Sequence, residues 1–294
     1  MPQLLKNDNL EVHIDLPNEN YQHSRFDWTG KIVKVLFKGK LISSAEDIEP
    51  MLKSHVGLGF YNEFGIDSPL GFKEIKIGDW FHKIGVGLLQ KDSDTYAFNN
   101  DYKIDPCKFS VDIKQHSLLI DCVSKNVNGY AYELSKEISL CENNFTINYT
   151  LKNTGNKNIL TNEYNHNFIA VEKDFIGEKY QLNFPFKIKP KLFKEAVNLE
   201  KKVIVGAGDI RFSGIPKQQF FFSNLNGCKP VEACWELFHK SSKLGIRETG
   251  SFLAKKVNLW GWQKAICPEM FFEISLAPSK SLTWSRSYDL FTLE

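Results

Sequence analysis

The chain has 294 residues, 37 basic and 35 acidic, and a formal net charge of +2. This near balance gives no electrostatic footprint for nucleic acid or for an anionic membrane surface. The chain is long enough to bury a substantial core, and its 42% hydrophobic content is typical of a globular protein. We expect one domain over residues 1–294.

Alternation of apolar and polar residues predicts strands along most of the chain. The first clear run is 33–37, where alternate positions are Val, Val and Phe. Residues 138–151 alternate on both sides of a turn at 142–144, and residues 282–290 repeat the pattern. No regular strand–helix alternation exists. The pattern therefore predicts an all-β fold, a large antiparallel β-sandwich with few short helices.

Two segments carry weaker signals. Ser43 and Glu46 have capping-box spacing, which favours one helical turn before Pro50. A Gly-x-Gly pair at 206–208 begins like a dinucleotide-binding loop, but Arg211 stands at its third glycine position and no helical pattern follows. We interpret this second segment as a β-turn.

Six cysteines are spread along the chain without a CxxC pair or a zinc-type spacing. The amino-terminal residues lack an apolar signal region, and no apolar run reaches the length of about 18 residues that a membrane span needs. We therefore expect free thiols, no metal site, no membrane partner and a cytoplasmic location.

Charged side chains with apolar neighbours mark two candidate binding segments. Arg25 offers a rigid fork of donors for vicinal hydroxyls or a carboxylate, although a surface pair with Asp27 is the alternative. Glu63 and Lys83 each lie in an apolar, glycine-containing setting, where a charge must be paired or face a cleft. We expect these two to pair, either at a binding site or as a structural ion pair.

Two later segments carry candidate acid/base groups. His166 lies among asparagines and aromatic rings and has the side chain best suited to proton transfer near neutral pH, although a hydrogen-bonded core histidine is the alternative. Glu269 lies in an apolar run, where desolvation raises the pKa of a carboxyl and makes its anion a better base. Glu273 shares that strand face, so spacing leaves both open. Trp260 is a stacking platform or a core residue.

Together these segments resemble the galactose mutarotase-like superfamily, the aldose 1-epimerases and their relatives, over roughly residues 20–290. The resemblance rests on the motifs Arg25-Phe-Asp-Trp-Thr-Gly30, Asn62-Glu-Phe-Gly65, Lys83-Ile-Gly-Val-Gly87, Asn153-Thr-Gly155, Tyr164-Asn-His-Asn-Phe168, Cys267-Pro-Glu269 and Leu276-Ala-Pro-Ser279 with Trp284 and Tyr288. The Asn-Arg-Ile segment that carries a binding arginine in galactose mutarotases is missing, which leaves the sugar open.

The resemblance implies a sandwich with a concave sugar cleft, in which His166 is the general acid and Glu269 the general base. The substrate-binding residues that we expect with them are Arg25, Glu63, His82, Lys83, Asn165 and Trp260. The implied reaction interconverts the α and β anomers of an aldose or sugar derivative by acid/base ring opening, without a cofactor.

The expected partner is a small carbohydrate, bound by a monomer or a homodimer. Two other functions fit the same sequence. One is a carbohydrate-binding or sensing protein without turnover. The other is a polysaccharide-acting lyase or hydrolase, which needs a second carboxylate opposite Glu269, with Glu63 as the candidate.

Overall fold

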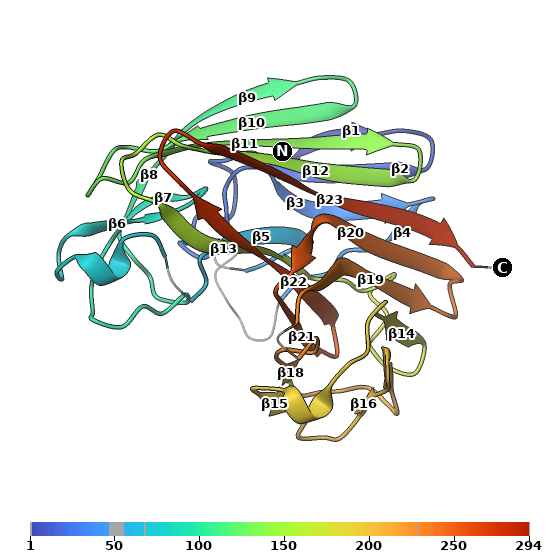
Figure 1. Cartoon of the computed structure of the whole chain (residues 1–294). Coiled ribbons are helices and arrows are strands. Elements are labelled where there is room, and N and C mark those ends of the chain that lie inside the picture. Colours follow the sequence, from blue (N-terminus) through green and yellow to red (C-terminus); the bar gives the residue numbers. More distant parts are fainter. Residues whose placement is uncertain (1, 47–55, 68, 228, 294) are drawn as a thin grey trace.

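The computed structural model describes residues 2–46, 56–67, 69–227 and 229–293. Strands make up almost all of the regular structure in these ranges (Figure 1). The helical elements found there are two 3₁₀ turns, η1 (Phe72–Glu74) and η2 (Pro190–Leu192). None of the described helices is long and apolar enough to cross a membrane. The predicted all-β class is confirmed.

Sheet 1 has ten strands among the described residues and carries the segments around His166 and Glu269. Its strands, in spatial order, are β1 (Gln3–Lys6), β2 (Leu10–Asp15), β3 (Lys31–Phe37), β5 (Phe60–Phe64), β13 (Ile159–Asn167), β22 (Ala265–Leu276), β21 (Lys256–Trp262), β18 (Phe220–Phe222) and β15 (Ala196–Val197), with β4 (Lys40–Leu41) paired to β3.

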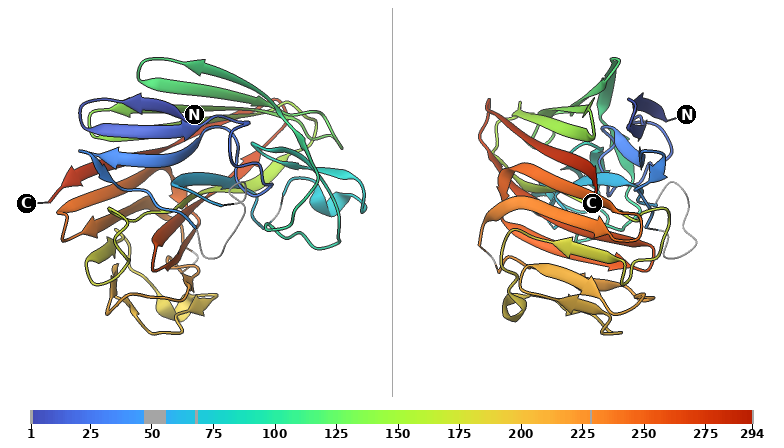
Figure 2. Two further views of the ribbon diagram at one scale, coloured as in Figure 1. Left: turned by 180° about the vertical axis from the view of Figure 1, so that it is seen from behind. Right: turned by 90° about the vertical axis from the view of Figure 1, so that its right-hand side faces the viewer.

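In the part of the chain that the structure describes, sheet 2 also has ten strands, and Figure 2 shows it twisting from the green β9 to the gold β16. Its strands, in spatial order, are β16 (Val203–Val205), β17 (Asp209–Phe212), β14 (Tyr180–Asn183), β19 (Val231–His239), β20 (Leu244–Ala254), β23 (Ser281–Thr292), β12 (Asn144–Asn153), β11 (Tyr132–Cys141), β10 (Ser117–Val123) and β9 (Lys108–Ile113). A three-stranded sheet 3, which the sequence did not predict, contains β6 (Trp80–Lys83), β7 (Gly87–Gln90) and β8 (Ile104–Pro106).

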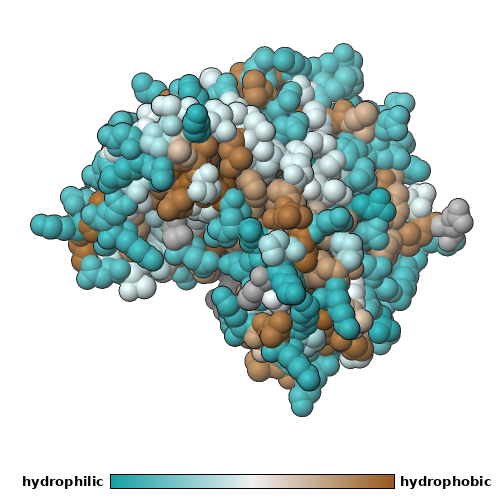
Figure 3. Space-filling view, in the orientation of Figure 1, coloured by the Kyte–Doolittle hydropathy of each residue, from teal (hydrophilic) through white to brown (hydrophobic). Residues whose placement is uncertain are grey.

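The core lies between sheets 1 and 2, because their strands turn alternate apolar side chains toward each other. Phe60 of sheet 1 packs edge-on against Phe145 and Tyr288 of sheet 2, with ring centroids 5.4 and 5.1 Å apart. On the face shown in Figure 3 hydrophilic side chains predominate, although hydrophobic ones gather near the middle and in smaller groups elsewhere. The interior between the sheets thus takes up most of the large apolar side chains.

Local structure confirms two of the sequence predictions. The alternating segments around 142–144 form the β11–β12 hairpin, in which Cys141 pairs with Asn144 and Glu142 has a φ of 49°. The Gly-x-Gly segment at 206–208 turns the chain between β16 and β17, which pair antiparallel. This second segment is therefore a β-hairpin connection, as interpreted.

The predicted helical turn at Ser43 is wrong for the residues that the structure describes. Ser43 forms a β-bridge with Ile169, and its hydroxyl oxygen accepts a hydrogen bond from the backbone N–H of Val35 (3.1 Å). The hydroxyl is therefore engaged with β3 and caps no helix. Pro50 and the rest of the predicted turn lie outside the described residues.

Candidate functional site

Strand register brings the two predicted acid/base residues together. β13 and β22 are antiparallel neighbours, with Glu163 opposite Phe272 and, farther along, Ile169 bridged to Ile266. The same register sets His166 opposite Glu269. Residues two apart on a strand share a face, so Cys267 lies on the same side of β22 as Glu269. The Cys-Pro-Glu motif thus presents a thiol and a carboxylate to one histidine.

The His166 ring lies between these two groups. Its Nε2 is 3.4 Å from Oε1 of Glu269, and its Nδ1 is 2.7 Å from Sγ of Cys267. The ring stacks on Phe168, with centroids 4.3 Å apart. On the far side, Asn258 of β21 donates a hydrogen bond to Oε2 of Glu269 (3.2 Å). Phe168 therefore holds the imidazole in place, and Asn258 holds the carboxylate.

Burial shifts the proton affinity of each member of this cluster. Desolvation raises the pKa of Glu269 to about 7, against the hydrogen bond from Asn258 and the charge of Arg25. Desolvation, followed by the charge of Arg25, lowers the pKa of His166 well below its usual value. The carboxyl thus titrates near neutral pH, and the imidazole is mainly neutral there.

Arg25 reaches the cleft from the segment between β2 and β3. Its Nε donates to Oε2 of Glu63 (3.1 Å), and its Nη1 lies 3.4 Å from Oε1 of Glu46. The guanidinium lies over the rings of Phe26 and Phe98, each 4.5 Å from the ring centroid. Two carboxylates and two rings hold the fork in place, while 13% of the side chain remains exposed.

Glu63 and Lys83 form the ion pair that the sequence predicts, behind Arg25. Lys83 Nζ donates to Oε1 of Glu63 (2.9 Å) and to the hydroxyl of Tyr96 (3.0 Å), and both charged side chains are fully buried. Burial opposes the charge of Lys83, but Glu63 and Tyr96 still raise its pKa. Tyr164 donates to Oε2 of Glu63 (2.7 Å). This network orients Arg25 and does not itself line the cleft.

A cleft of about 780 Å³ opens over this part of sheet 1. Its volume is in the usual range for small-molecule sites. Four of the eight predicted site residues line it: Arg25, His166, Trp260 and Glu269. The Trp260 ring stands 5.3 Å from that of His166 at an interplanar angle of 61°, which places an apolar face beside the acid/base pair.

The other predicted residues have different positions. Asn165 lies on the core face of β13, where it donates to the hydroxyl of Tyr288 (2.7 Å), so we correct its assignment as a substrate ligand. His82 is buried in sheet 3, its Nε2 3.4 Å from the carbonyl oxygen of Val127, and it does not line the cleft. Glu273 is exposed and also lies outside the cleft, so position favours Glu269.

The alternative interpretation, that Arg25 pairs with Asp27, is wrong. Asp27 is buried and accepts a hydrogen bond from Nζ of Lys136 (3.0 Å). The sequence did not predict Cys267 and Asn258 as site residues. The spacing of Cys267 from Glu269 carried a signal, because two residues on a strand place both on one face. Asn258 depends on strand pairing that spacing does not reveal.

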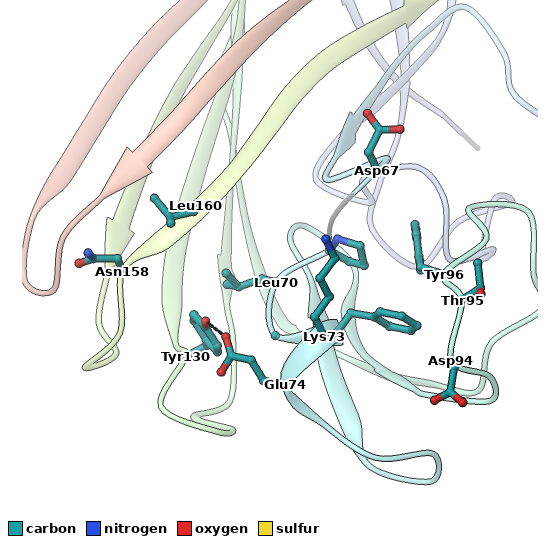
Figure 4. A pocket seen from close by; sticks show the side chains of 13 residues that line it. Asp67, Leu70, Lys73, Glu74, Asp94, Thr95, Tyr96, Tyr130, Asn158 and Leu160 are labelled. Carbon is teal, nitrogen blue, oxygen red and sulfur yellow. Dashed lines mark hydrogen bonds between the residues drawn. The ribbon is translucent and has the colours of Figure 1, made fainter.

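A second hollow, of about 410 Å³, lies beside η1 (Figure 4). Within it, Tyr130 donates a hydrogen bond to Glu74, which also pairs with Lys157 at 2.6 Å. Tyr130 and Lys157 thus already engage the Glu74 carboxylate. Asp67 lines both this hollow and the cleft, whereas His166 and Glu269 line the cleft alone. The chemistry predicted from the sequence therefore belongs to the cleft.

His166, Cys267 and Glu269 are also the group in the described ranges whose ligand atoms lie near enough for a metal, within 4.8 Å of one another. The thiol faces Nδ1, whereas the carboxylate faces Nε2. One metal ion binds only one ring nitrogen. The observed geometry therefore suits two separate contacts, one at each ring nitrogen, better than a shared metal.

Solved structures similar to this chain share its whole extent. No protein-family model and no curated protein sequence matches. A provisionally assigned aldose 1-epimerase from Escherichia coli K12 superposes with a TM-score of 0.62 at 12% identity, covering 100% of this chain and 99% of that one. Galactose mutarotase-like proteins from Lactobacillus casei (0.57, 12%, 99% and 100%) and Clostridium acetobutylicum (0.60, 11%, 99% and 95%) are also similar.

The chain has the galactose mutarotase-like fold. At these identities the likeness establishes the architecture, and the activity has to be argued from the cleft itself. The sequence resemblance predicted this fold, and the whole-chain superpositions confirm it.

Proposed function

We propose that the protein is an aldose 1-epimerase that interconverts the α and β anomers of an aldose or sugar derivative. The observation that carries this proposal is the contact between His166 and Glu269, whose Nε2 and Oε1 atoms are 3.4 Å apart at the cleft. Mutarotation needs one group that takes a proton and one that gives a proton on the same sugar. An imidazole and a basic carboxylate supply both.

In the proposed reaction, Glu269 takes the proton of the C1 hydroxyl while Nε2 of His166 donates a proton to the ring oxygen. The bond between C1 and the ring oxygen breaks, and the open aldehyde forms. Rotation about the C1–C2 bond then presents the other carbonyl face. Ring closure returns both protons, because the two residues exchange their roles.

The surroundings of the pair support this chemistry. Burial raises the pKa of Glu269 to about 7, so its carboxylate is a stronger base than an exposed one and is still available at neutral pH. Arg25 presents donors to sugar hydroxyls, and Trp260 offers a ring face for the apolar side of a pyranose.

Two of the cations that line the cleft are paired with carboxylates, and beside these two an uncharged aldose is favoured over a phosphosugar. Arg25 is accompanied by Glu46 at 3.4 Å, and Lys256 by Asp67 at 3.1 Å. These cations are therefore already neutralised by carboxylates before a ligand enters. A phosphate that approached either cation would also approach its carboxylate.

A polysaccharide-acting lyase or hydrolase that uses Glu63 as its second carboxylate is less well supported. That function needs a second carboxylate opposite Glu269, and Glu63 was the candidate. Glu63 is fully buried, binds Arg25 and Lys83, and does not line the cleft. A sugar-binding protein without turnover shares the same cleft and is separated from an epimerase by a rate measurement.

Polarimetry of freshly dissolved aldoses tests the proposal. We expect the protein to accelerate mutarotation of at least one common aldose, and we expect His166→Ala and Glu269→Gln each to lower that rate by about 10²- to 10⁴-fold. Glu273→Gln is the matched control and should retain the wild-type rate. Sugar binding in calorimetry without any acceleration would instead identify a binding protein.

A further inference from the structure

Cys267 contacts the imidazole of His166 at the ring nitrogen that faces away from Glu269. The residue is completely buried, and its Sγ lies 2.7 Å from Nδ1 of His166, on the side of the ring opposite Glu269. Cys267 is therefore out of reach of solvent and touches the imidazole directly. Its sulfur contacts one nitrogen of the imidazole ring, and the Glu269 carboxylate lies beside the other nitrogen.

The two contacts together specify where the ring carries its proton. A thiol has one proton to donate, and Nδ1 of His166 is the ring nitrogen beside it. An ionised Glu269 has only acceptor oxygens, and it faces Nε2. In a neutral imidazole one nitrogen donates and the other accepts. Both neighbours are satisfied when Nδ1 accepts from the thiol and Nε2–H points toward Glu269 and the cleft.

Electrostatics agree with this arrangement. Burial, followed by the charge of Glu269, raises the pKa of the Cys267 thiol well above its usual value, so the sulfur keeps its proton. Burial lowers the pKa of His166, which favours the neutral ring over an imidazolium. The neutral ring alone cannot release its Nε2 proton without becoming an imidazolate.

We propose that Cys267 is a positioning residue that holds neutral His166 in the Nε2–H form and passes its own proton to Nδ1 when the Nε2 proton goes to the sugar. This inference rests on the proposed function. As the C1–ring-oxygen bond breaks, Glu269 gains the hydroxyl proton and becomes neutral. Cys267 becomes a thiolate, and the imidazole stays neutral with its proton on Nδ1. The net charge of the cluster is unchanged, and ring closure reverses every transfer.

A thiol is suited to this position because of its acidity. An ordinary thiol is a much stronger acid than an aliphatic hydroxyl, so sulfur at this place gives up its proton to the ring more readily than a hydroxyl oxygen would. A hydroxyl at the same place keeps the hydrogen bond to Nδ1 but releases its proton much less readily. Serine at this position therefore separates the orienting role from the proton-supplying role.

The first experiment reads the tautomer of His166 without any substrate, by ¹H–¹⁵N correlation of the histidine rings at about pH 8.5, where Glu269 is ionised. The spectrum of His166→Gln identifies the signal. We expect the Nε2–H form in the wild type and in Cys267→Ser, and a changed Nδ1 shift with mixed tautomers in Cys267→Ala. A wild-type ring protonated on Nδ1, or an unchanged signal in Cys267→Ala, overturns the proposal.

The second experiment measures kcat and KM on an aldose that the wild type turns over. We expect Cys267→Ala to lower kcat by about 10- to 100-fold with little change in KM, and Cys267→Ser to give an intermediate kcat. Cys122→Ala is the matched control, because Cys122 is equally buried but lies on β10 in the core. If Cys267→Ala and Cys122→Ala lower kcat equally, the loss is one of packing and the proposal fails.

The two readouts separate this inference from the function on which it rests. If no aldose is turned over but Cys267→Ala alters the His166 tautomer, the proposed reaction fails while the orienting role of the thiol stands. If turnover is found and the tautomer is independent of Cys267, the reaction stands and the inference fails.

Discussion

Arg25 lies at the cleft and Arg286 lies between the two large sheets, and each contacts two carboxylates. Arg286 is fully buried; its guanidinium donates to Glu163 at 3.0 and 2.7 Å and to Glu248 at 2.6 Å. A further hydrogen bond goes to the carbonyl oxygen of Met270 (2.8 Å). Every nitrogen of this arginine is therefore engaged by the protein.

Arg25 is held less tightly. Its bond to Glu63 is 3.1 Å, whereas its contacts with Glu46 and with the hydroxyl of Tyr164 are 3.4 Å, and part of the side chain remains exposed. Donors with long contacts are available to a ligand. An arginine whose donors are all bound by the protein thus stabilises the fold. An arginine whose donors are partly exposed at a cleft can also bind a ligand.

The largest effect is expected at the saturated arginine. Arg286→Leu leaves the buried carboxylates of Glu163 and Glu248 without their cation, so we expect the free energy of unfolding to fall by about 3–5 kcal/mol. Urea unfolding measures the change. A loss below about 1 kcal/mol would break the comparison, because Arg286 would then be no more structural than an exposed ion pair.

At the cleft, Arg25→Leu is expected to act on binding. Charged hydrogen bonds to substrate hydroxyls contribute roughly 1.5–3 kcal/mol, so KM should rise by about 10- to 100-fold while urea unfolding changes less than in Arg286→Leu. Steady-state mutarotation kinetics and the same unfolding assay give both values. An unchanged KM with a large loss of stability would place Arg25 with Arg286.

Carboxylates at the two places also differ. Glu163 is bound by an arginine, whereas the direct partners of Glu269 are an amide and an imidazole. Because the pKa of Glu269 is about 7 and its ionised form is the proposed base, kcat/KM should be constant above that pH and fall about tenfold per pH unit well below it. A profile that is flat from about pH 5 to 8 would contradict the assignment of Glu269.

The smallest effect is expected at Trp260. Its ring face contributes packing to a sugar but no charge, so Trp260→Ala should raise KM by roughly 3- to 10-fold with little change in kcat. Trp284→Ala, in the core against Tyr149, should instead lower the unfolding midpoint. Equal effects of the two variants on KM would remove the distinction between a platform and a core tryptophan.

The alternation of apolar and polar residues along the chain predicts much of this fold. Residues 145–151 and 282–290 alternate because one face of each strand packs between the sheets, and both lie in sheet 2 as neighbours. Sheet 3 was not predicted, because its strands are short and two of them, β6 and β7, are buried along most of their length and therefore lack alternation. The turn expected at Ser43 failed because tertiary pairing with Ile169 outweighed a local capping signal.

Only part of the candidate site could be predicted from the sequence. The pairing of Glu63 with Lys83 was predicted and is present. Asn165 and His166 are adjacent on one strand and therefore point to opposite faces, so the same rule that predicts the strand separates Asn165 from the cleft. The approach of Arg25 to the cleft, and the partnership of Asn258 with Glu269, depend on chain segments that only tertiary structure brings together.

The most direct test of the account is two-dimensional exchange NMR of the α and β anomeric protons of an aldose at equilibrium. We predict exchange cross-peaks with the wild-type protein that disappear in both His166→Ala and Glu269→Gln, while Glu273→Gln retains them. Exchange that persists in Glu269→Gln and His166→Ala, with both variants folded, would contradict the claim that this pair carries out the chemistry.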